Sequence, residues 1–354
     1  MPLPWSMASR VGLSVFLLLV SKYHLIQLWV FGTMFSPEMP RFLVILFSWL
    51  FCSFVLLLFL VVVFDVVLLG SWLVRKGRAL SATTRLRVRY GLVTLAMALA
   101  AFGMHQAIKV PDVRRVELTI RNLPPAFSGF RMVQLTDLHI SKMLGAPWLR
   151  AVVDRTNALN PDLVVITGDL IDGTVQARGD TLQAYADLHA KYGVITSLGN
   201  HEYYFDAKAW TDEFERLGMQ VLVNRHKVID INGQQLVVAG LADLKALVYG
   251  QAGPDAALAL AGAPKDAPIV LLSHQPVTAY QNKQVNPAIQ LSGHTHGGMI
   301  RGFDKLIERF NGGLVSGLYA IEDMQVYVSN GTGLWNGFPV RLGVPSEITE
   351  FVLR

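Results

Sequence analysis

The feature that most constrains the fold of this chain is a set of five short polar segments, most of which end a hydrophobic run. They are Asp137-Leu138-His139, Gly168-Asp169, Gly199-Asn200-His201-Glu202, His274 and Gly293-His294-Thr295-His296-Gly297. Hydrophobic runs that end in small or polar residues are typical of buried strands, which deliver their last residues to the rim of a sheet. We therefore expect the five segments to converge on one rim of one α/β core.

The first two segments follow the clearest strand patterns. Residues 131–136 lead directly into Asp137 and His139, and alternate residues of an extended backbone point to the same side. We expect these two side chains to act together. Residues 162–167 form a β-branched run that ends at Gly168-Asp169, where glycine allows the backbone to turn sharply.

The segments between and after these runs predict repeated βαβ units. Residues 146–159 carry apolar side chains at helical spacing and end at Asn-Pro, which predicts a helix. A second helix is expected around residues 181–190, followed by a strand over 194–198. Strands over 268–273 and 288–292 would deliver the remaining histidines. All the polar groups therefore belong to one site.

The residue types in these segments indicate a divalent metal site. Carboxylate, imidazole and amide groups suit hard or borderline ions such as Mn, Fe and Zn. A single Asp-x-His or Gly-Asp pair is common and would carry little weight, but five of the nine histidines of the chain fall in the ordered motifs. The other histidines lie outside any motif and are interpreted as structural: His24, His105, His189 and His226.

In this order, the motifs resemble those of the calcineurin-like metallophosphoesterase superfamily, DxH, GDxxD, GNHE, H and GHxH. The resemblance covers the chain from about residue 123 to the C-terminus. Within the superfamily the chain is most similar to membrane-anchored bacterial phosphodiesterases with hydrophobic N-terminal helices, a likeness carried by residues 134–139, 293–298 and 331–333. The resemblance implies a four-layer α/β/β/α sandwich, preceded here by an all-α transmembrane region.

The resemblance also implies a role for each motif residue around two divalent ions, which could be Mn, Fe, Zn or Mg. The first ion would be held by Asp137, His139, Asp169 and His296, and the second by Asp169, Asn200, His274 and His294. Asp169 is then the bridging carboxylate. A metal-bridging hydroxide would attack phosphorus in line, while the unligated His201 protonates the leaving oxygen or stabilises the transition state. Asp172 would orient ligands, and Glu202 would hold an imidazole tautomer.

Composition divides the chain into an apolar, basic N-terminal region and a mixed-charge remainder. Residues 1–110 carry ten Lys or Arg and only two acids, whereas residues 111–354 carry 21 basic and 24 acidic residues. The positive net charge therefore belongs to the N-terminal region and is no sign of nucleic-acid binding. Residues 11–31, 42–69 and 90–107 are long and apolar enough to predict three membrane spans, read as an anchor and not as a cleaved signal peptide.

The charges between the predicted spans give an orientation. Basic residues crowd the second connection, at Arg75, Lys76, Arg78, Arg85, Arg87 and Arg89, whereas the first connection is nearly neutral. The positive-inside rule places the basic loop in the cytoplasm. Three spans then predict a multi-pass protein of the cell (inner) membrane with its catalytic part on the non-cytoplasmic side.

Two domains follow: a transmembrane region over residues 1–110 and one catalytic α/β domain over 111–354. The latter is long enough for a single large core. It would open with an edge strand over residues 116–120. The sole cysteine, Cys52, lies in the second predicted span, so no disulfide is expected in the catalytic domain.

These observations predict a membrane-anchored, two-metal phosphoester hydrolase that acts on a phosphodiester or pyrophosphate borne by a lipid. The expected partners are the bilayer and its lipid-linked substrate, and the sequence predicts no particular protein partner. Apolar loop residues, above all Trp335 and Phe338, could guide an acyl chain or could simply pack against the core. A phosphomonoesterase for soluble substrates and a non-catalytic membrane sensor or scaffold are the alternatives.

Overall fold

A computed structural model describes residues 5–74 and 80–354, and the chain divides into two compact units. The helical unit comprises Met1–Gln106 together with Asn336–Leu342, and the α/β unit comprises Ala107–Trp335 with Gly343–Arg354. The division near residue 107 lies close to the expected boundary at 110. The segment Asn336–Leu342 differs, because the sequence placed it in the catalytic domain.

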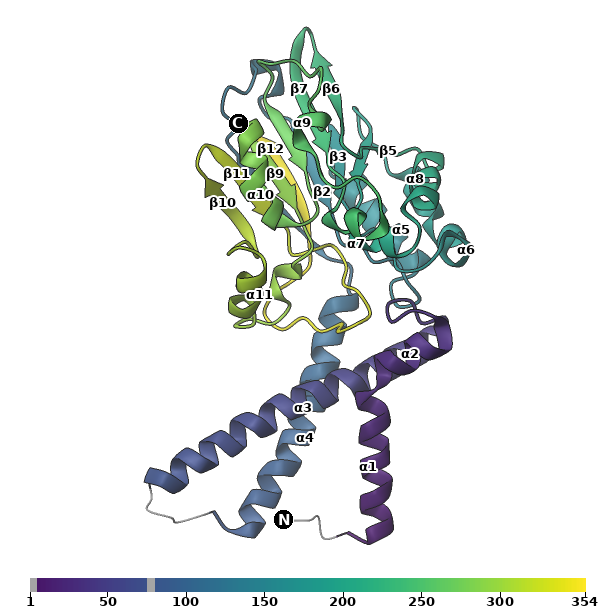
Figure 1. Ribbon diagram of the computed structural model, residues 1–354, viewed down its shortest axis with the longest axis vertical. Coiled ribbons are helices and arrows are strands. Elements are labelled where there is room, and N and C mark those ends of the chain that lie inside the picture. The colour runs from purple at the N-terminus through teal and green to yellow at the C-terminus, as the bar shows by residue number, and fades with distance from the viewer. Residues whose placement is uncertain (1–4, 75–79) are drawn as a thin grey trace. The chain divides into compact units, whose positions relative to one another are not determined.

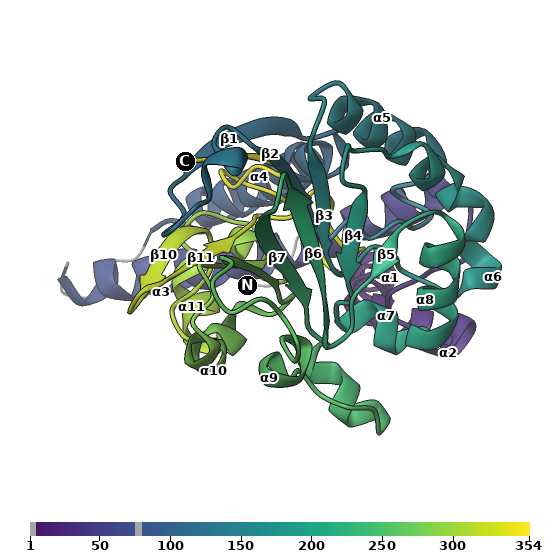
Figure 2. The same ribbon diagram turned by 90° about the horizontal axis from the view of Figure 1, so that it is seen from above.

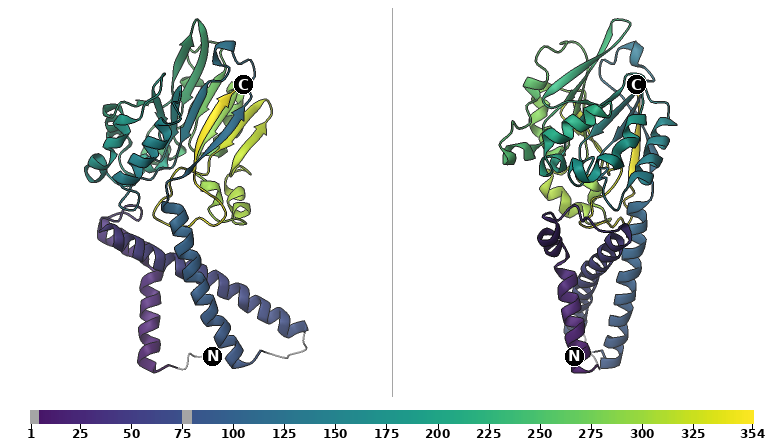
Figure 3. Two further views of the ribbon diagram at one scale, coloured as in Figure 1. Left: turned by 180° about the vertical axis from the view of Figure 1, so that it is seen from behind. Right: turned by 90° about the vertical axis from the view of Figure 1, so that its right-hand side faces the viewer.

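The helical unit contains α1 (Met7–Ser21), α2 (Tyr23–Phe31), α3 (Arg41–Val74) and α4 (Ala82–Ile108) (Figure 1). Among the described residues, α3 and α4 are each long and apolar enough to cross a membrane. The pair α1 and α2 bends by 61° where Lys22 separates the two helices, so it adds a third span only if the bent pair crosses as one (Figure 3). Arg75, Lys76 and Arg78 of the predicted basic loop lie outside the described residues.

Polar contacts join the elements within the helical unit. Asp65 of α3 forms an ion pair with Arg89 of α4 at 3.4 Å, which compensates the only acid of the longest apolar helix. The 336–342 segment is held by His24, whose Nε2 lies 2.8 Å from the carbonyl oxygen of Gly337, and by a bond from Asn336 to the Phe35 carbonyl. His24 is therefore structural, as the sequence suggested.

The α/β unit is built from two six-stranded sheets (Figure 1, Figure 2). The first has the order β1-β12-β2-β3-β4-β5, from β1 (Asp112–Leu118), β2 (Arg131–Leu135), β3 (Leu163–Thr167), β4 (Val194–Ser197), β5 (Gln220–Val221) and β12 (Glu347–Leu353). The second has the order β10-β11-β9-β8-β7-β6, from β6 (Arg225–Ile231), β7 (Gln234–Gly240), β8 (Ile269–Leu272), β9 (Ile289–Ser292), β10 (Gly317–Ile321) and β11 (Met324–Val328). The expected edge strand begins four residues earlier than predicted.

The core lies between the two sheets. Met132 and Val165 of the first sheet and Val238 and Leu291 of the second belong to one buried apolar cluster. Because successive side chains of a strand point to opposite faces, the other face of each sheet needs its own cover. Part of that cover comes from α5 (Ala146–Asn157) and α8 (Ala207–Arg216), which bury apolar residues, and from α9 (Ala256–Ala259), which contacts β6 and β7. The unit also contains α6 (Val175–Arg178), α7 (Asn200–Tyr204), α10 (Ala279–Asn282) and α11 (Asp304–Phe310). The four-layer α/β/β/α arrangement is confirmed.

Parallel pairing explains why the polar segments share one rim. β2, β3 and β4 are mutually parallel, and so are β7, β8 and β9, so the carboxyl ends of each set meet at one edge.

The helix expected around residues 181–190 is wrong in type, because Gly179–Asp187 forms a 3-10 helix, η2. Its largest buried side chains, Leu182 and Tyr185, are three residues apart, which matches the 3-10 repeat.

Candidate metal centre

Asp137 and His139 come together by a route that the sequence did not indicate. β2 ends at Leu135, and both residues have left-handed backbone, with φ of 53° for Asp137 and 46° for His139. The expectation of an extended backbone at these positions is therefore wrong. Asp169, His294 and His296 also have positive φ, a conformation that is costly for residues other than glycine and that concentrates at functional sites.

The turn after β3 depends on Gly168. Its φ is +85°, and a Cβ atom placed on it would lie 2.4 Å from the amide nitrogen of Gly199. Only glycine therefore allows the loops that follow β3 and β4 to touch. This contact brings Asp169 against the Asn200-His201 turn, where the amide of His201 donates to Asp169 Oδ1 at 2.8 Å.

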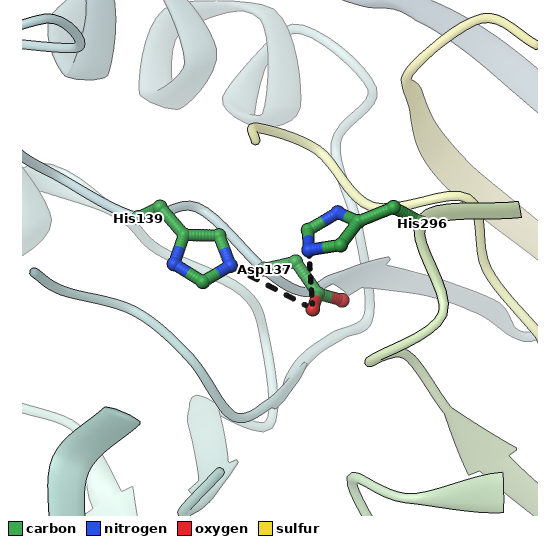
Figure 4. Close-up of side chains that lie close together, drawn as sticks. All are labelled: Asp137, His139 and His296. Atoms are coloured by element: carbon green, nitrogen blue, oxygen red, sulfur yellow. Dashed lines mark ion pairs between the residues drawn. The ribbon is translucent and has the colours of Figure 1, made fainter. Parts of the chain in front are cut away.

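One cluster of potential ligands contains Asp137, His139 and His296. The two imidazoles approach the same carboxylate oxygen, Asp137 Oδ1, with Nε2 distances of 3.9 Å for His139 and 3.6 Å for His296 (Figure 4). One ligand atom from each of the three residues lies within 4.8 Å of the others. Such spacing is close enough for all three to reach one ion.

A second cluster contains Asp169, His274 and His294, again with one ligand atom each within 4.8 Å of the others. Asp169 Oδ2 lies 3.2 Å from His274 Nε2 and 3.7 Å from Nε2 of His139, a member of the first cluster. The carboxylate of Asp169 is thus close to groups of both clusters. The amide oxygen of Asn200 is buried and accepts no hydrogen bond from the described residues.

Hydrogen bonds to the outer ring nitrogens orient the imidazoles toward the centre. Asp172 Oδ1 lies 3.1 Å from His139 Nδ1, and His274 Nδ1 lies 2.8 Å from the carbonyl oxygen of Thr167. Both acceptors favour a proton on Nδ1, which leaves the Nε2 lone pair for a metal. The Nε2 atoms of His139 and His274 are buried without a hydrogen-bond partner among the described residues, as open ligand positions require.

Glu202 has a different role from the one expected. Its carboxylate accepts bonds from the backbone amides of Gly199, Asp169 and Leu170, at 2.7, 3.0 and 2.7 Å. It therefore braces the two loop backbones and does not hold an imidazole. Asp172 fills the imidazole-orienting role, since the same Oδ1 lies 2.5 Å from Nδ1 of His201.

The electrostatics of the centre favour cations. Asp137, Asp169 and Glu202 are buried, and within the described residues no Lys or Arg forms an ion pair with any of them. Buried carboxylates are costly unless positive charge compensates them. Although burial opposes it, the carboxylates of Asp169 and Asp172 raise the pKa of His201 to about 9.

The surroundings of His294 shift its pKa in the opposite direction. Burial and the neighbouring His274 lower the pKa of His294 to about 3, so its imidazole is neutral near pH 7, as a metal ligand must be. For Asp169, burial raises the pKa, but His274 and His201 outweigh that effect and hold it well below the usual range. The donor set, the orphaned nitrogens and the excess negative charge all fit divalent ions.

Comparisons with known proteins agree with this geometry. A family model described as calcineurin-like phosphoesterase matches residues 130–298. A transmembrane protein with metallophosphoesterase domain from Danio rerio is 34% identical over 357 residues, covering 98% of this chain and 80% of the relative. The chain belongs to the calcineurin-like metallophosphoesterases. An uncharacterized metallophosphoesterase from Campylobacter jejuni is also 34% identical, over 79% of this chain and 73% of the relative.

Among solved structures, a dimetal phosphatase from Danio rerio is similar over 58% of this chain and 88% of its own, with a TM-score of 0.38 and 14% identity. That likeness is too low to add an argument about substrate. Family membership and the two clusters together make this metallophosphoesterase a metal-dependent phosphoester hydrolase, and the clusters fit a binuclear metal site.

The structure adds residues that sequence reasoning missed. Thr136 donates to Asp137 Oδ2 at 2.8 Å, and the ring of Tyr204 lies 5.0 Å from that of His201. Tyr204 follows His201 by three residues in α7, so helical spacing could have identified it. Asp243 is buried and caps a 3-10 helix by accepting from the amide of Lys245 at 2.7 Å.

The apolar loop residues have separate surroundings. Trp335 is half-buried and belongs to the α/β unit, whereas Phe338 is half-buried and belongs to the helical unit. Their role as guides for an acyl chain stays a prediction. Met143 and Leu144, which follow the first motif, are fully buried and pack in the core of the metallophosphoesterase domain.

Proposed function

We propose that this metallophosphoesterase is a membrane-anchored phosphodiesterase or pyrophosphatase whose substrate is borne by a lipid. The observation that carries the proposal is the pairing of two buried ligand clusters with helices that have the length and composition of membrane spans. α4 ends at Ile108 and β1 begins at Asp112, so the connector reaches at most about 14 Å. Substrates held in the bilayer would therefore be presented at high effective concentration.

Each motif residue has a proposed role. Asp137, His139 and His296 would hold one ion, Asn200, His274 and His294 the other, and Asp169 would contact both. Two divalent ions bound there would supply an activated water near neutral pH and charge stabilisation of the reacting phosphoryl group. Asp172 fixes the rings of His139 and His201 through Nδ1.

His201 is the proposed acid. Because Asp169 and Asp172 favour its protonated form, its Nε2 carries a proton near pH 7, and Nε2 points toward the centre at 3.9 Å from Asp169 Oδ2. A proton at that atom could pass to the leaving oxygen or stabilise charge as it develops there.

The proposed side of the membrane depends on a single helix. If the basic segment before α4 is cytoplasmic, α4 leads out of the cytoplasm, and the α/β unit is non-cytoplasmic whether α1 and α2 make one span or none. Reporter fusions at residue 80 and at Arg354 would check this arrangement. A cytoplasmic signal from Arg354 would contradict it and would bring cytoplasmic nucleotide-linked lipids into consideration.

The substrate class can be tested on the full chain reconstituted in lipid nanodiscs. After loading with Mn, Fe, Zn or Mg, kcat/KM would be measured for bis(p-nitrophenyl) phosphate and for p-nitrophenyl phosphate. We expect the diester to be preferred, and hydrolysis of lipid extracts to release a phosphorylated product. A clear preference for the monoester would favour the alternative, a phosphomonoesterase for soluble substrates.

A further inference from the structure

The 3-10 helix η3 (Leu244–Tyr249) stands at the same rim as the metal centre. It follows β7, whose last residue, Gly240, pairs with Leu272 at the end of the parallel strand β8, and β8 leads directly to His274. The carboxylate of Asp243 holds η3 beside the segment that carries His274. Its Oδ1 accepts from the amide of Lys245 at 2.7 Å and from the side chain of Gln275, the residue after His274, at 2.9 Å.

A path of aromatic rings leads from the centre to η3. The ring of His201 lies 5.0 Å from that of Tyr204, and the Tyr204 ring lies 6.5 Å from that of Tyr249. The ammonium group of Lys245 lies over the face of Tyr204, 5.4 Å from the ring centroid. These contacts connect the proposed acid to the outer surface of the α/β unit through side chains of two elements.

The outer end of this path is apolar and exposed. Leu247, Val248 and Tyr249 are 62%, 73% and 49% exposed, and the buried residue of η3 is Ala246. A run of three exposed apolar or aromatic residues is unfavourable in water and usually marks a binding surface. Core packing does not explain it, because these exposed residues belong to none of the described core clusters.

We propose that Tyr204, Lys245 and the Leu247-Val248-Tyr249 run form a subsite for the apolar chain of an amphiphilic phosphoester, an inference that rests on the proposed function. The occupant follows from the chemistry of the path. Tyr204, whose ring lies beside His201 and under the Lys245 ammonium, is the first of these side chains that a phosphoester at the metal centre would meet, and Tyr249, Leu247 and Val248 lie beyond it on η3. A cationic group, aromatic rings and aliphatic side chains placed together match a charged head joined to a hydrocarbon chain.

The inference predicts a dependence on chain length. Metal-loaded full chain in nanodiscs would be assayed with methyl and with octyl p-nitrophenyl phosphate, and the ratio of the two kcat/KM values would be compared between proteins. The Leu247→Ser/Val248→Ser variant should lower the octyl-to-methyl ratio about tenfold, because loss of apolar contact in a pocket costs on this scale. Leu318→Ser, on the edge strand β10 and 49% exposed, is the matched control and should keep the wild-type ratio.

A second measurement does not depend on turnover. Binding of octylphosphonate, followed by calorimetry, should weaken in the double variant and not in Leu318→Ser. An unchanged ratio together with unchanged octylphosphonate binding would overturn the subsite while leaving the phosphodiesterase proposal intact. Failure of the wild-type chain to hydrolyse either diester would instead overturn the proposed function, and this inference with it.

Discussion

The metal centre and the membrane-type helices depart from ordinary protein chemistry in opposite directions. The centre buries charge, with Asp137, Asp172 and Glu202 fully shielded from solvent, whereas α3 exposes hydrocarbon, with Val66 at 64% and Val74 at 84%. Burial of charge requires compensating cations, and exposure of hydrocarbon requires a lipid environment. Each region therefore indicates a partner that is not protein, and the two should respond to different perturbations.

The largest expected effect is at the carboxylate near both ligand clusters. Asp169→Asn should abolish turnover and lower metal content, because an amide cannot neutralise two cations. Changes to outer residues of metal sites already cost about 10- to 100-fold in metal affinity, and a ligand shared by both ions should cost more. Metal per chain and hydrolysis of bis(p-nitrophenyl) phosphate check this prediction.

Two controls separate this effect from unfolding. Asp212→Asn, an exposed site on α8 that pairs with Lys208, should keep activity and metal content. Insertion of the Asp169→Asn protein into membranes should be normal. Wild-type metal content and turnover in Asp169→Asn would remove Asp169 from the centre.

The next largest effect is expected at His201. His201→Ala should keep both metals and lose about 10²- to 10⁴-fold in rate, the usual contribution of a positioned acid or base. The loss should shrink as the leaving group becomes a weaker base, because such a group needs no proton. Equal losses for poor and activated leaving groups would point to charge stabilisation in place of proton donation.

Much of this centre could be predicted from the sequence because each of its strands is encoded by a short, local hydrophobic pattern. The strands before Asp137, Asp169 and His274 are short and almost wholly buried, so their hydrophobic pattern identified them. The convergence of the polar segments on one rim could be predicted because consecutive strands of βαβ units are parallel. The metal site could be predicted because carboxylate, imidazole and amide groups are common ligands of divalent ions. The family resemblance supplied the assignment of residues to each ion.

Other features lie beyond local patterns. β12, at the end of the chain, inserts between β1 and β2, and nothing in residues 347–353 alone indicates those partners. The left-handed φ of Asp137 and His139 goes with tertiary backbone contacts, in which the two amides donate to the carbonyl oxygens of Gly168 and Asp169 at 3.0 and 3.1 Å. The backbone-bracing role of Glu202 likewise needs two loops that meet only in the fold.

A smaller effect, on stability alone, is expected at Glu350 in β12. Its buried carboxylate accepts from Arg115 and Arg131. Burial raises the pKa of Glu350, but the two guanidinium groups outweigh it and hold the pKa below its usual value. Glu350→Gln should lower the free energy of unfolding by about 1.5–3 kcal/mol, the range for hydrogen bonds to charged groups.

The pH dependence gives a second readout for the same pair of arginines. Because the folded pKa of Glu350 is depressed, its stabilisation is present above the unfolded pKa and is lost as pH falls through the folded value. Thermal melts between pH 3 and 7 should therefore show a weaker acid dependence in Glu350→Gln. Glu117→Gln, at an exposed carboxylate that pairs with Arg354, should retain the wild-type dependence, and identical curves for all three proteins would contradict the assignment.

The smallest effect on substrate selectivity is expected near residue 335, where the chain passes from the α/β unit to the helical unit. Trp335 and Phe338 were the residues that the sequence favoured for an acyl chain, yet Phe338 lies in a segment bound to the helical unit through Asn336 and Gly337. If that segment serves the helices, Trp335→Ala/Phe338→Ala should change the octyl-to-methyl selectivity less than Leu247→Ser/Val248→Ser does. Its effect should appear mainly as lower thermal stability in nanodiscs. A selectivity loss larger than that of the η3 variant would restore the aromatic pair as the acyl-chain guide and would assign the exposed η3 residues another role.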